Sequence, residues 1–161
     1  MKFKTLSENW ETILGGKDEL PASFDFSKQS NINAKGKKGY ETHYVYKDEE
    51  GYTAFIVERN RKERGDKFFT LYSKQRHKGN HSEKWMAKQY PEPRPIYNLH
   101  KLATDRAKLS LVVVEGEKAA NAYAALNLYK VTTWACGAYA VLQNDWNPIK
   151  DYSHIILCPD N

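Results

Sequence analysis

Two acidic residues near the C-terminal end of the sequence each follow an apolar run. Glu115 comes directly after Leu-Val-Val-Val at 111–114, and Asp160 stands just beyond Ile-Ile-Leu-Cys at 155–158. Short runs rich in valine and isoleucine are typical of strands buried on both faces of a parallel sheet, and the carboxyl ends of such strands meet at one edge. We therefore expect the two carboxylates to lie close together. They could bind Mg²⁺, which takes few protein carboxylates and keeps water or phosphate as its other ligands.

The residues after Glu115 indicate how it is positioned. Gly116 allows a tight turn because it has no Cβ. Ala119, Tyr123 and Leu126 then recur at the spacing of one helix face, which predicts a helix over residues 119–128. Glu117 and Lys118 are expected to be exposed at the start of this helix. Further strands are expected at 131–134 and 155–158. The alternative is that Glu115 is an ordinary solvated residue of a strand-to-helix turn, and the turn by itself favours neither interpretation.

The surroundings of the two acids resemble the TOPRIM domain of primases and topoisomerases, most closely the primase-like proteins of phages and mobile elements. The resemblance rests on Val-Val-Glu-Gly-Glu-Lys-Ala-Ala at 113–120, Gly137-Ala138 after the next apolar run, and Ile-Ile-Leu-Cys-Pro-Asp-Asn at 155–161. It implies that Glu115 is the acid/base or metal-poising residue and that Gly116 and Gly137 form the turns of the motifs. It also implies that Asp160 is the first, metal-binding Asp of an Asp-x-Asp motif.

The family resemblance implies a DNA primase-type nucleotidyltransferase. Its cofactor would be Mg²⁺ or Mn²⁺, and it would make RNA primers from nucleoside triphosphates on single-stranded DNA in DNA replication, with a replicative helicase as a further partner. The chain stops at Asn161, before the position of the second Asp. We therefore expect a fragment or truncated form of a longer protein, with weak metal binding and little catalysis alone. Two alternatives stay open: a TOPRIM nuclease-like DNA-processing enzyme and a catalytically inactive nucleic-acid-binding module.

The chain is basic before its acidic C-terminal part. The net charge is +5; residues 111–161 contain three Lys against five Asp or Glu and so carry −2, which leaves +7 for residues 1–110. Cations beside an acidic catalytic edge suit an enzyme that acts on a polyanion. The candidates for binding nucleic acid or nucleotide are Arg59, Arg61, Lys62, Arg64, Lys67 and Arg76.

The basic region has the pattern of a small antiparallel sheet. Aromatic and β-branched runs at 43–46 and 52–57 flank a turn that ends in Gly51, which predicts a hairpin, and 67–72 predicts a third strand. The aromatic residues of these strands are expected to pack in the core or on a half-buried face. Lys67-Phe68-Phe69, Trp85 and Ile96-Tyr97-Asn98-Leu99 follow the order of the basic subdomain that precedes TOPRIM in primases.

The predicted fold class is α+β. A basic antiparallel β-rich subdomain at 40–95 is followed by a partial α/β TOPRIM domain at 96–161, which is Rossmann-like with a parallel sheet and opens with a helix at 100–108. Residues 1–39 are expected to be an N-terminal segment and linker, with a short helix placed by the spacing of Trp10, Ile13 and Leu14.

Several classes of protein are disfavoured by composition. No apolar run approaches the eighteen or so residues of a membrane span. The N-terminus lacks a hydrophobic signal region, so a cytoplasmic location without membrane contact is expected. Cys136 and Cys158 have no metal-binding spacing and are expected to be buried free thiols. His77 and His81 flank a sequence that is poor for a helix, and a solvated loop is expected there.

Overall fold

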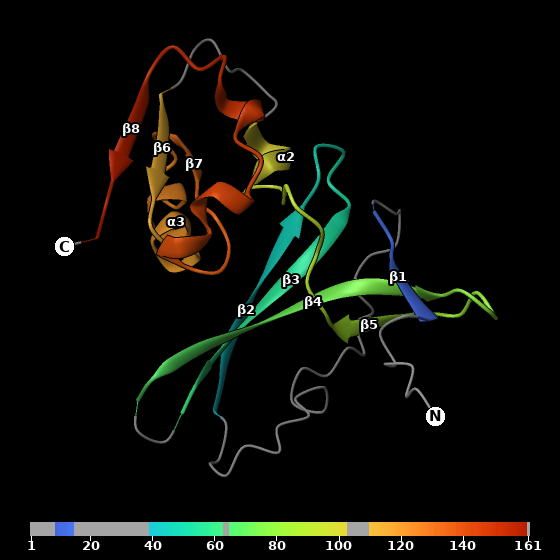
Figure 1. Ribbon diagram of the computed structural model, residues 1–161. Helices are drawn as coiled ribbons and strands as arrows, with labels where there is room; N and C mark the ends of the chain where they lie inside the picture. The colour runs from blue at the N-terminus through green and yellow to red at the C-terminus, as the bar shows by residue number, and fades with distance from the viewer. Residues whose placement is uncertain (1–8, 15–38, 63–64, 103–109, 161) are drawn as a thin grey trace.

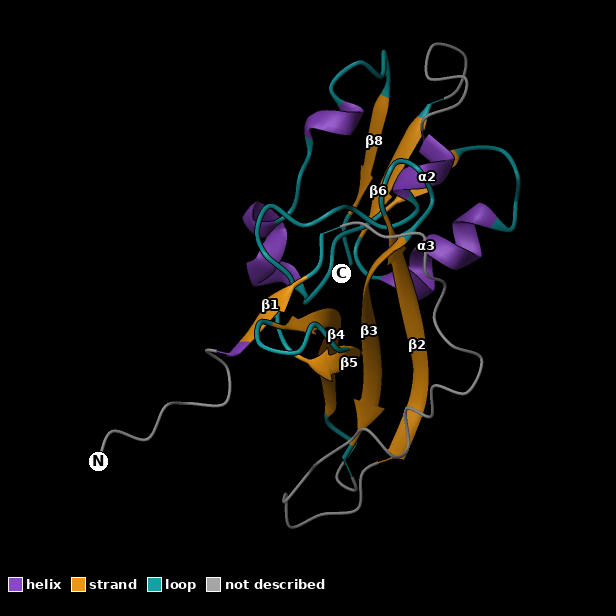
Figure 2. Ribbon diagram, turned by 90° about the vertical axis from the view of Figure 1, so that its right-hand side faces the viewer, coloured by secondary structure: helices purple, strands orange, loops and turns teal. Residues whose placement is uncertain are grey.

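The structure is a computed structural model that describes residues 9–14, 39–62, 65–102 and 110–160. Its elements are β1 (Trp10–Thr12), β2 (Gly39–Lys47), β3 (Thr53–Arg61), β4 (Lys67–His77), β5 (Glu83–Ala87), α2 (Leu99–Leu102), β6 (Leu111–Val114), α3 (Glu117–Ala124), β7 (Lys130–Thr132), the 3-10 helices η2 (Ala138–Gln143) and η3 (Asn147–Ile149), and β8 (Ile155–Cys158). An antiparallel sheet is followed by a small parallel sheet with a helix against it, so the predicted α+β class is confirmed at this level (Figure 1). In Figure 2 the parallel sheet and its helices stand above one end of the long strands β2 and β3.

The antiparallel sheet is built on the hairpin that the sequence predicts. β2 pairs with β3, and β4 pairs with the other edge of β3, all antiparallel. Gly51 in the β2–β3 turn has φ 90°, a left-handed conformation that glycine adopts without strain. Asp48 Oδ1 accepts a hydrogen bond from the backbone N–H of Tyr52 at 2.7 Å, which closes the same turn. The predicted strand at 67–72 is confirmed and extends to His77, and β5 pairs with β4 as well.

The predicted helix around Trp10 is wrong, because Trp10–Thr12 form the strand β1. β1 pairs antiparallel with the end of β4, so that Trp10 is level with His77. The two rings meet edge-on with their centroids 4.9 Å apart, and Lys84 Nζ lies 4.4 Å from the centroid of the Trp10 ring. Partners distant in the sequence thus override the local helical spacing. Residues 1–8 and 15–38, which include most of the predicted linker, lie outside the described residues.

The C-terminal sheet is parallel, as predicted, with the strand order β7-β6-β8. β6 is buried along its whole length, which agrees with its unbroken run of apolar residues. The register places Val113 level with Thr132 of β7 and with Leu157 of β8. The carboxyl ends of the three strands therefore point the same way.

The helix after Glu115 is shorter than predicted. α3 begins at Glu117 but ends at Ala124, so Leu126, expected on its apolar face, lies in the following turn and is exposed. The helix packs instead through Ala120, which is fully buried in the core with residues of β6 and β7. At the predicted helix of residues 100–108 the structure has α2 (Leu99–Leu102), and residues 103–109 lie outside the described part of the chain.

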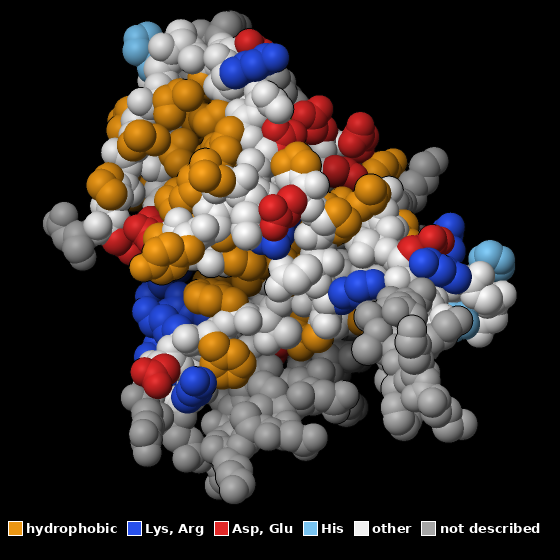
Figure 3. All heavy atoms as spheres, in the orientation of Figure 1, with side chains coloured by type: hydrophobic (Ala, Val, Ile, Leu, Met, Phe, Trp, Pro, Cys, Tyr) orange, Lys and Arg blue, Asp and Glu red, His pale blue; other side chains and the backbone are white. Residues whose placement is uncertain are grey.

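The strand before Asp160 is confirmed as β8, but the expectation that it is buried is wrong. Its apolar side chains are 42% (Ile155), 42% (Ile156) and 71% (Leu157) exposed. Among the described strands β8 pairs only with β6, so it forms the edge of the sheet. Figure 3 shows the hydrophobic side chains that reach the surface of this upper part of the molecule.

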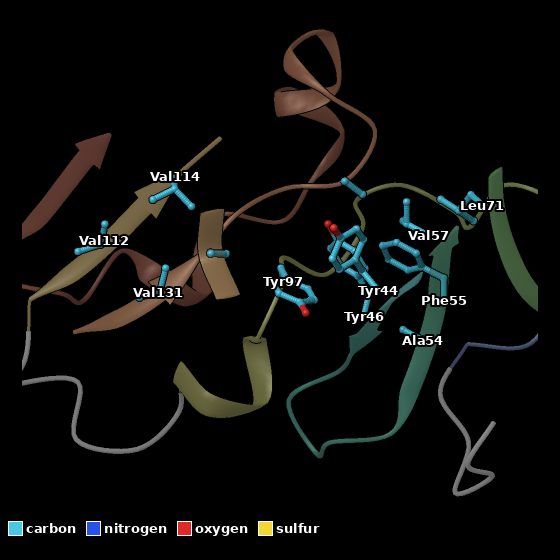
Figure 4. Packing of buried hydrophobic residues seen from close by; sticks show 12 residues of the cluster. Tyr44, Tyr46, Ala54, Phe55, Val57, Leu71, Tyr97, Val112, Val114 and Val131 are labelled. Carbon is cyan, nitrogen blue, oxygen red and sulfur yellow. The ribbon is translucent and has the colours of Figure 1, made fainter. Parts of the chain in front are cut away.

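One hydrophobic core joins the two sheets. Tyr44, Tyr46, Phe55, Val57 and Leu71 of the antiparallel sheet belong to the same buried cluster as Val112, Val114, Ala120 and Val131 of the C-terminal unit. Tyr97, from the connection between the two parts, packs against Tyr46 with their ring centroids 5.2 Å apart and stands between the two groups in Figure 4. The sheet and the C-terminal unit are therefore held in a fixed relation by shared apolar burial. The predicted boundary between residues 95 and 96 stays a prediction.

The helices in the described ranges are all short. None of them is long and apolar enough to cross a membrane.

Candidate active site

A cleft of about 560 Å³ opens between the antiparallel sheet and the carboxyl edge of the parallel sheet. From the C-terminal unit it is lined by Glu115 and Asp160, by the first residues of α3, and by Trp134, Cys136 and Gly137. From the antiparallel sheet it is lined by Arg59, Lys67 and Phe69. In Figure 3 a group of blue Lys and Arg side chains lies at the left side of the molecule, with acidic side chains just above it near the C-terminal end.

The two acidic residues reach this cleft from neighbouring parallel strands. Val114 at the end of β6 is level with Cys158 at the end of β8, so Glu115 and Asp160 both follow at the same edge. Gly116 has φ 91°, and its backbone N–H donates a hydrogen bond to Thr133 Oγ1 at 2.9 Å. This bond fixes the turn that carries Glu115, whereas Asp160 is exposed beyond the end of its strand.

The cations of the cleft come from one face of the antiparallel sheet. The register places Arg59 opposite Phe69 and Arg61 opposite Lys67. Side chains alternate between the two faces of a strand, so Arg59, Lys67 and Phe69 share a face. Arg59 Nε lies 2.7 Å from Glu41 Oε2 of β2, and the same carboxylate pairs with Arg61.

Glu117 is buried, and the expectation that it is exposed at the helix start is wrong. It is only 6% exposed, and its Oε1 accepts a hydrogen bond from the hydroxyl of Tyr46 at 2.8 Å. Burial raises the pKa of the Glu117 carboxyl, while the Tyr46 bond and the charge of Arg59 act in the opposite direction. Glu117 therefore ties the first turn of α3 to strand β2, next to the cleft that it helps to line.

The remaining predicted cations do not line the cleft. Arg61 is exposed and paired with Glu41, and Lys62 is exposed at the start of the β3–β4 connection. Arg76 lies near the other end of β4, where its Nη2 is 2.7 Å from Glu83 Oε1. Arg64 lies outside the described residues. Of the six predicted cations, the structure brings Arg59 and Lys67 to Glu115 and Asp160.

Local sequence patterns do not identify every residue that forms the cleft or holds its cations. The period of two along a strand would have placed Phe69 beside Lys67, so that signal was present. The roles of Glu41 and Glu117 depend on cross-strand and tertiary partners, which local patterns do not carry. Gly137, predicted as a motif turn, has φ 77° and precedes η2, so its position requires glycine's conformational freedom.

The donor set of the cleft fits a hard divalent cation. Two carboxylates, Glu115 and Asp160, are available, and Mg²⁺ is often held by one or two carboxylates together with water and substrate phosphate. The described residues contain no group of three or more His, Cys, Asp or Glu side chains arranged to hold a metal. Cys136 also lines the cleft, and burial raises the pKa of its thiol, which disfavours the thiolate form. Cys136 and Cys158 are free thiols, as predicted, but both are only partly buried.

Comparison with models of known protein families, with curated proteins and with solved structures finds no match for this chain. It is a mixed α+β chain in which a basic antiparallel sheet faces two carboxylates at the edge of a parallel sheet.

The Tyr46–Glu117 hydrogen bond supports a first prediction. Tyr46→Phe is expected to lower the free energy of unfolding by about 1–3 kcal/mol, because it leaves a buried carboxyl oxygen without its partner. Tyr44→Phe is the control, since the Tyr44 hydroxyl makes no hydrogen bond within the described residues and the ring stays in the same core. Urea unfolding of both variants measures the difference, and equal losses would contradict a role for this bond.

The same pair predicts a pH dependence. The pKa of Glu117 in the folded chain lies above its ordinary value of 4.5, so the unfolded chain releases this proton first and stability falls as the pH rises between the two values. A hydroxyl binds a carboxylate more strongly than a neutral acid. The destabilisation by Tyr46→Phe is therefore expected to be larger at neutral pH than at acid pH, and a constant difference would contradict ionisation of Glu117.

Proposed function

We propose that this chain carries the catalytic cleft of a DNA primase-type nucleotidyltransferase with a TOPRIM-like parallel sheet. In this proposal it joins nucleoside triphosphates on a single-stranded DNA template with Mg²⁺ or Mn²⁺. The observation that carries the proposal is the arrangement of charge in one cleft, where Glu115 and Asp160 face Arg59 and Lys67. Carboxylates suit a metal ion, and cations suit the phosphates that such a metal accompanies.

The order of elements around Glu115 supports the same assignment. β6, the Glu115-Gly116 turn, α3 and β7 form a strand–turn–helix–strand unit, and β8 adds a parallel strand that leads to Asp160. Ligands of open α/β sheets bind outside the carboxyl ends of the strands, which is where both carboxylates stand.

Each group in the cleft has a distinct proposed role. Asp160 and Glu115 would hold the metal ion, which when bound offsets phosphate charge. Glu115 is held on a fixed turn by the Gly116–Thr133 hydrogen bond, which suits a residue that must keep its position during proton transfer. Arg59 and Lys67 would bind phosphate oxygens by charge-assisted hydrogen bonds. Lys67 is exposed, whereas Arg59 is held between Glu41 and the region of Glu117.

The first turn of α3 adds to the attraction for phosphate. Residues 116–119 line the cleft, and the backbone N–H groups at the start of a helix favour nearby negative charge. The Glu117 carboxyl offsets this attraction for phosphate only in part, because it is turned into the core toward Tyr46.

The test of this proposal is templated synthesis. The chain, incubated with nucleoside triphosphates, Mg²⁺ and single-stranded DNA, is expected to form dinucleotides slowly, and chelation of the metal is expected to stop the reaction. Cleavage of the DNA in place of synthesis would favour the TOPRIM nuclease-like alternative. Binding of DNA without either reaction would favour a nucleic-acid-binding module, a candidate in keeping with the two-carboxylate donor set of the described residues.

A further inference from the structure

One face of the antiparallel sheet changes character along its length. Phe55, Val57 and Leu71 are buried on this face in the core that the sheet shares with the C-terminal unit. Two positions further along each strand, in the direction of the β3–β4 connection, the same face carries Arg59 and Phe69. The face is therefore apolar under the C-terminal unit and becomes cationic and aromatic where it enters the cleft.

Phe69 is an exception among the aromatic residues of the sheet. Tyr46, Phe55 and Tyr72 are fully buried, whereas Phe69 is 44% exposed and lines the cleft. It makes no ring–ring contact with the described aromatic residues. Water at an exposed aromatic ring is displaced favourably by another apolar or aromatic surface.

The neighbours of Phe69 indicate what that surface would be. Arg59 is its direct cross-strand partner, and Lys67 stands two positions before it on the same strand and face. Proteins that bind single-stranded nucleic acid combine cations that contact the backbone with aromatic side chains on which bases stack. An aromatic ring between two cations therefore matches a ligand that has both a flat base and a phosphate.

Trp134, the other large aromatic residue of the cleft, is already engaged. Its Nε1 donates a hydrogen bond to the carbonyl oxygen of Gly137 at 2.9 Å, and its ring meets Trp146 with centroids 6.1 Å apart. Within the described ranges Phe69 makes no such ring–ring contact, so its ring face is available to a ligand.

We propose that Phe69 is a base-stacking platform, which holds the base of a nucleotide whose phosphates lie on Arg59 and Lys67. The proposal rests on the proposed function and adds a base-binding subsite to it. The ligand is a nucleobase joined to phosphate, and its source is either a free nucleoside triphosphate or a nucleotide within a single strand. The stacking face is tolerant of sequence, because every base has a π-face.

The experiment compares ligands with and without a base on matched variants. Calorimetry would measure the binding of ATP, inorganic tripolyphosphate, an oligothymidylate and an abasic oligonucleotide, all with Mg²⁺, to the wild-type chain. Phe69→Leu keeps apolar bulk without the π-face, and Phe69→Trp restores a larger one. Tyr139→Leu is the control for loss of an aromatic residue, because Tyr139 is fully exposed outside this cleft.

Phe69→Leu is expected to weaken binding of a base-containing ligand by about 5- to 150-fold and to leave tripolyphosphate and the abasic strand unchanged. Phe69→Trp and Tyr139→Leu are expected to bind like the wild type. A loss confined to ATP identifies the free nucleotide as the ligand, and a loss confined to the oligothymidylate identifies the single strand. Urea unfolding of each variant separates weakened binding from weakened folding.

Two different results would overturn the inference, and they are distinguishable. If the wild-type chain binds ATP and tripolyphosphate but Phe69→Leu changes neither ATP nor oligothymidylate binding, or weakens the base-free ligands equally, Phe69 is not a stacking platform and the proposed function stands. If the wild-type chain binds none of the four ligands, the proposed function fails and the subsite fails with it.

Discussion

Glu115→Gln is expected to abolish the Mg²⁺-dependent strengthening of nucleoside triphosphate binding and to lower templated synthesis by about 100-fold or more, the range in which a positioned acid or base contributes. Glutamine has nearly the shape of glutamate but neither its charge nor its ability to take up a proton. The turn should keep its conformation, because Gly116 and Thr133 fix it through a backbone N–H and a hydroxyl. Binding of single-stranded DNA is therefore expected to change little.

Glu49→Gln is the matched control for this variant. Glu49 is an exposed carboxylate in the β2–β3 turn and does not line the cleft, so the same change of charge is made away from the site. Metal-dependent nucleotide binding and the synthesis rate are measured for both, with thermal unfolding as the test of folding. If Glu115→Gln unfolds the chain, or if synthesis survives it, Glu115 is an ordinary turn residue.

If the two carboxylates bind one metal ion, the effects of substituting them should not be additive. If Glu115 and Asp160 hold one ion, adding Asp160→Asn to Glu115→Gln should cost little beyond the first substitution, because the ion is already lost. Effects of independent sites would add.

The sequence predicts the parts of this fold that local patterns determine. The hairpin of β2 and β3 follows from aromatic and β-branched residues around Gly51. The turn after β6 follows from a valine run that ends at Val114 and is followed by Glu115 and Gly116. The carboxyl ends of β6 and β8 coincide because the strands are parallel, and that was enough to predict that Glu115 and Asp160 would follow at one edge.

The predictions that are wrong concern residues whose environment depends on partners distant in the sequence. Trp10–Thr12 is too short to show a period of its own, and its pairing with β4 makes it a strand. Glu117 has the helix-start position of a solvated acid, yet Tyr46, 71 residues away, provides the partner that allows its burial. Exposure of β8 could not be read from its composition either, because burial depends on what packs across a strand and not on how apolar it is.

The predicted cations of the candidate site also show that local sequence patterns do not reveal contacts between distant residues. The prediction of six cations rests on charge alone, whereas carboxylates on neighbouring strands set the environment of Arg59, Arg61 and Arg76. Glu41 pairs with Arg59 and Arg61, and Glu83 pairs with Lys74 and Arg76. Each carboxylate forms ion pairs with two cations. The number of cations in this region therefore overstates the positive charge that a polyanion would meet. The register of β3 and β4 then decides that Arg59 and Lys67 reach the cleft.

The two ion-pair clusters, one around Glu41 and one around Glu83, provide a matched test of where phosphate binds. The variant Arg59→Gln/Lys67→Gln removes two cations that line the cleft. The control Arg76→Gln/Lys78→Gln removes one cation near the other end of β4 and one just beyond that end. Both change the net charge equally, and each leaves its carboxylate a second cation, Arg61 beside Glu41 and Lys74 beside Glu83. Any difference between them therefore reports position and not total charge.

The cleft variant is expected to weaken nucleoside triphosphate binding by about 100-fold or more, because two charge-assisted hydrogen bonds are lost. For single-stranded DNA, the slope of log K against log salt should become shallower by about 1.4, since each phosphate contact on a single strand contributes about 0.7. The control variant should leave triphosphate binding unchanged. Titrations over a range of salt concentrations measure both quantities. Equal losses in the two variants would mean that the sheet attracts polyanions through its overall charge, and that Arg59 and Lys67 have no special place in binding them.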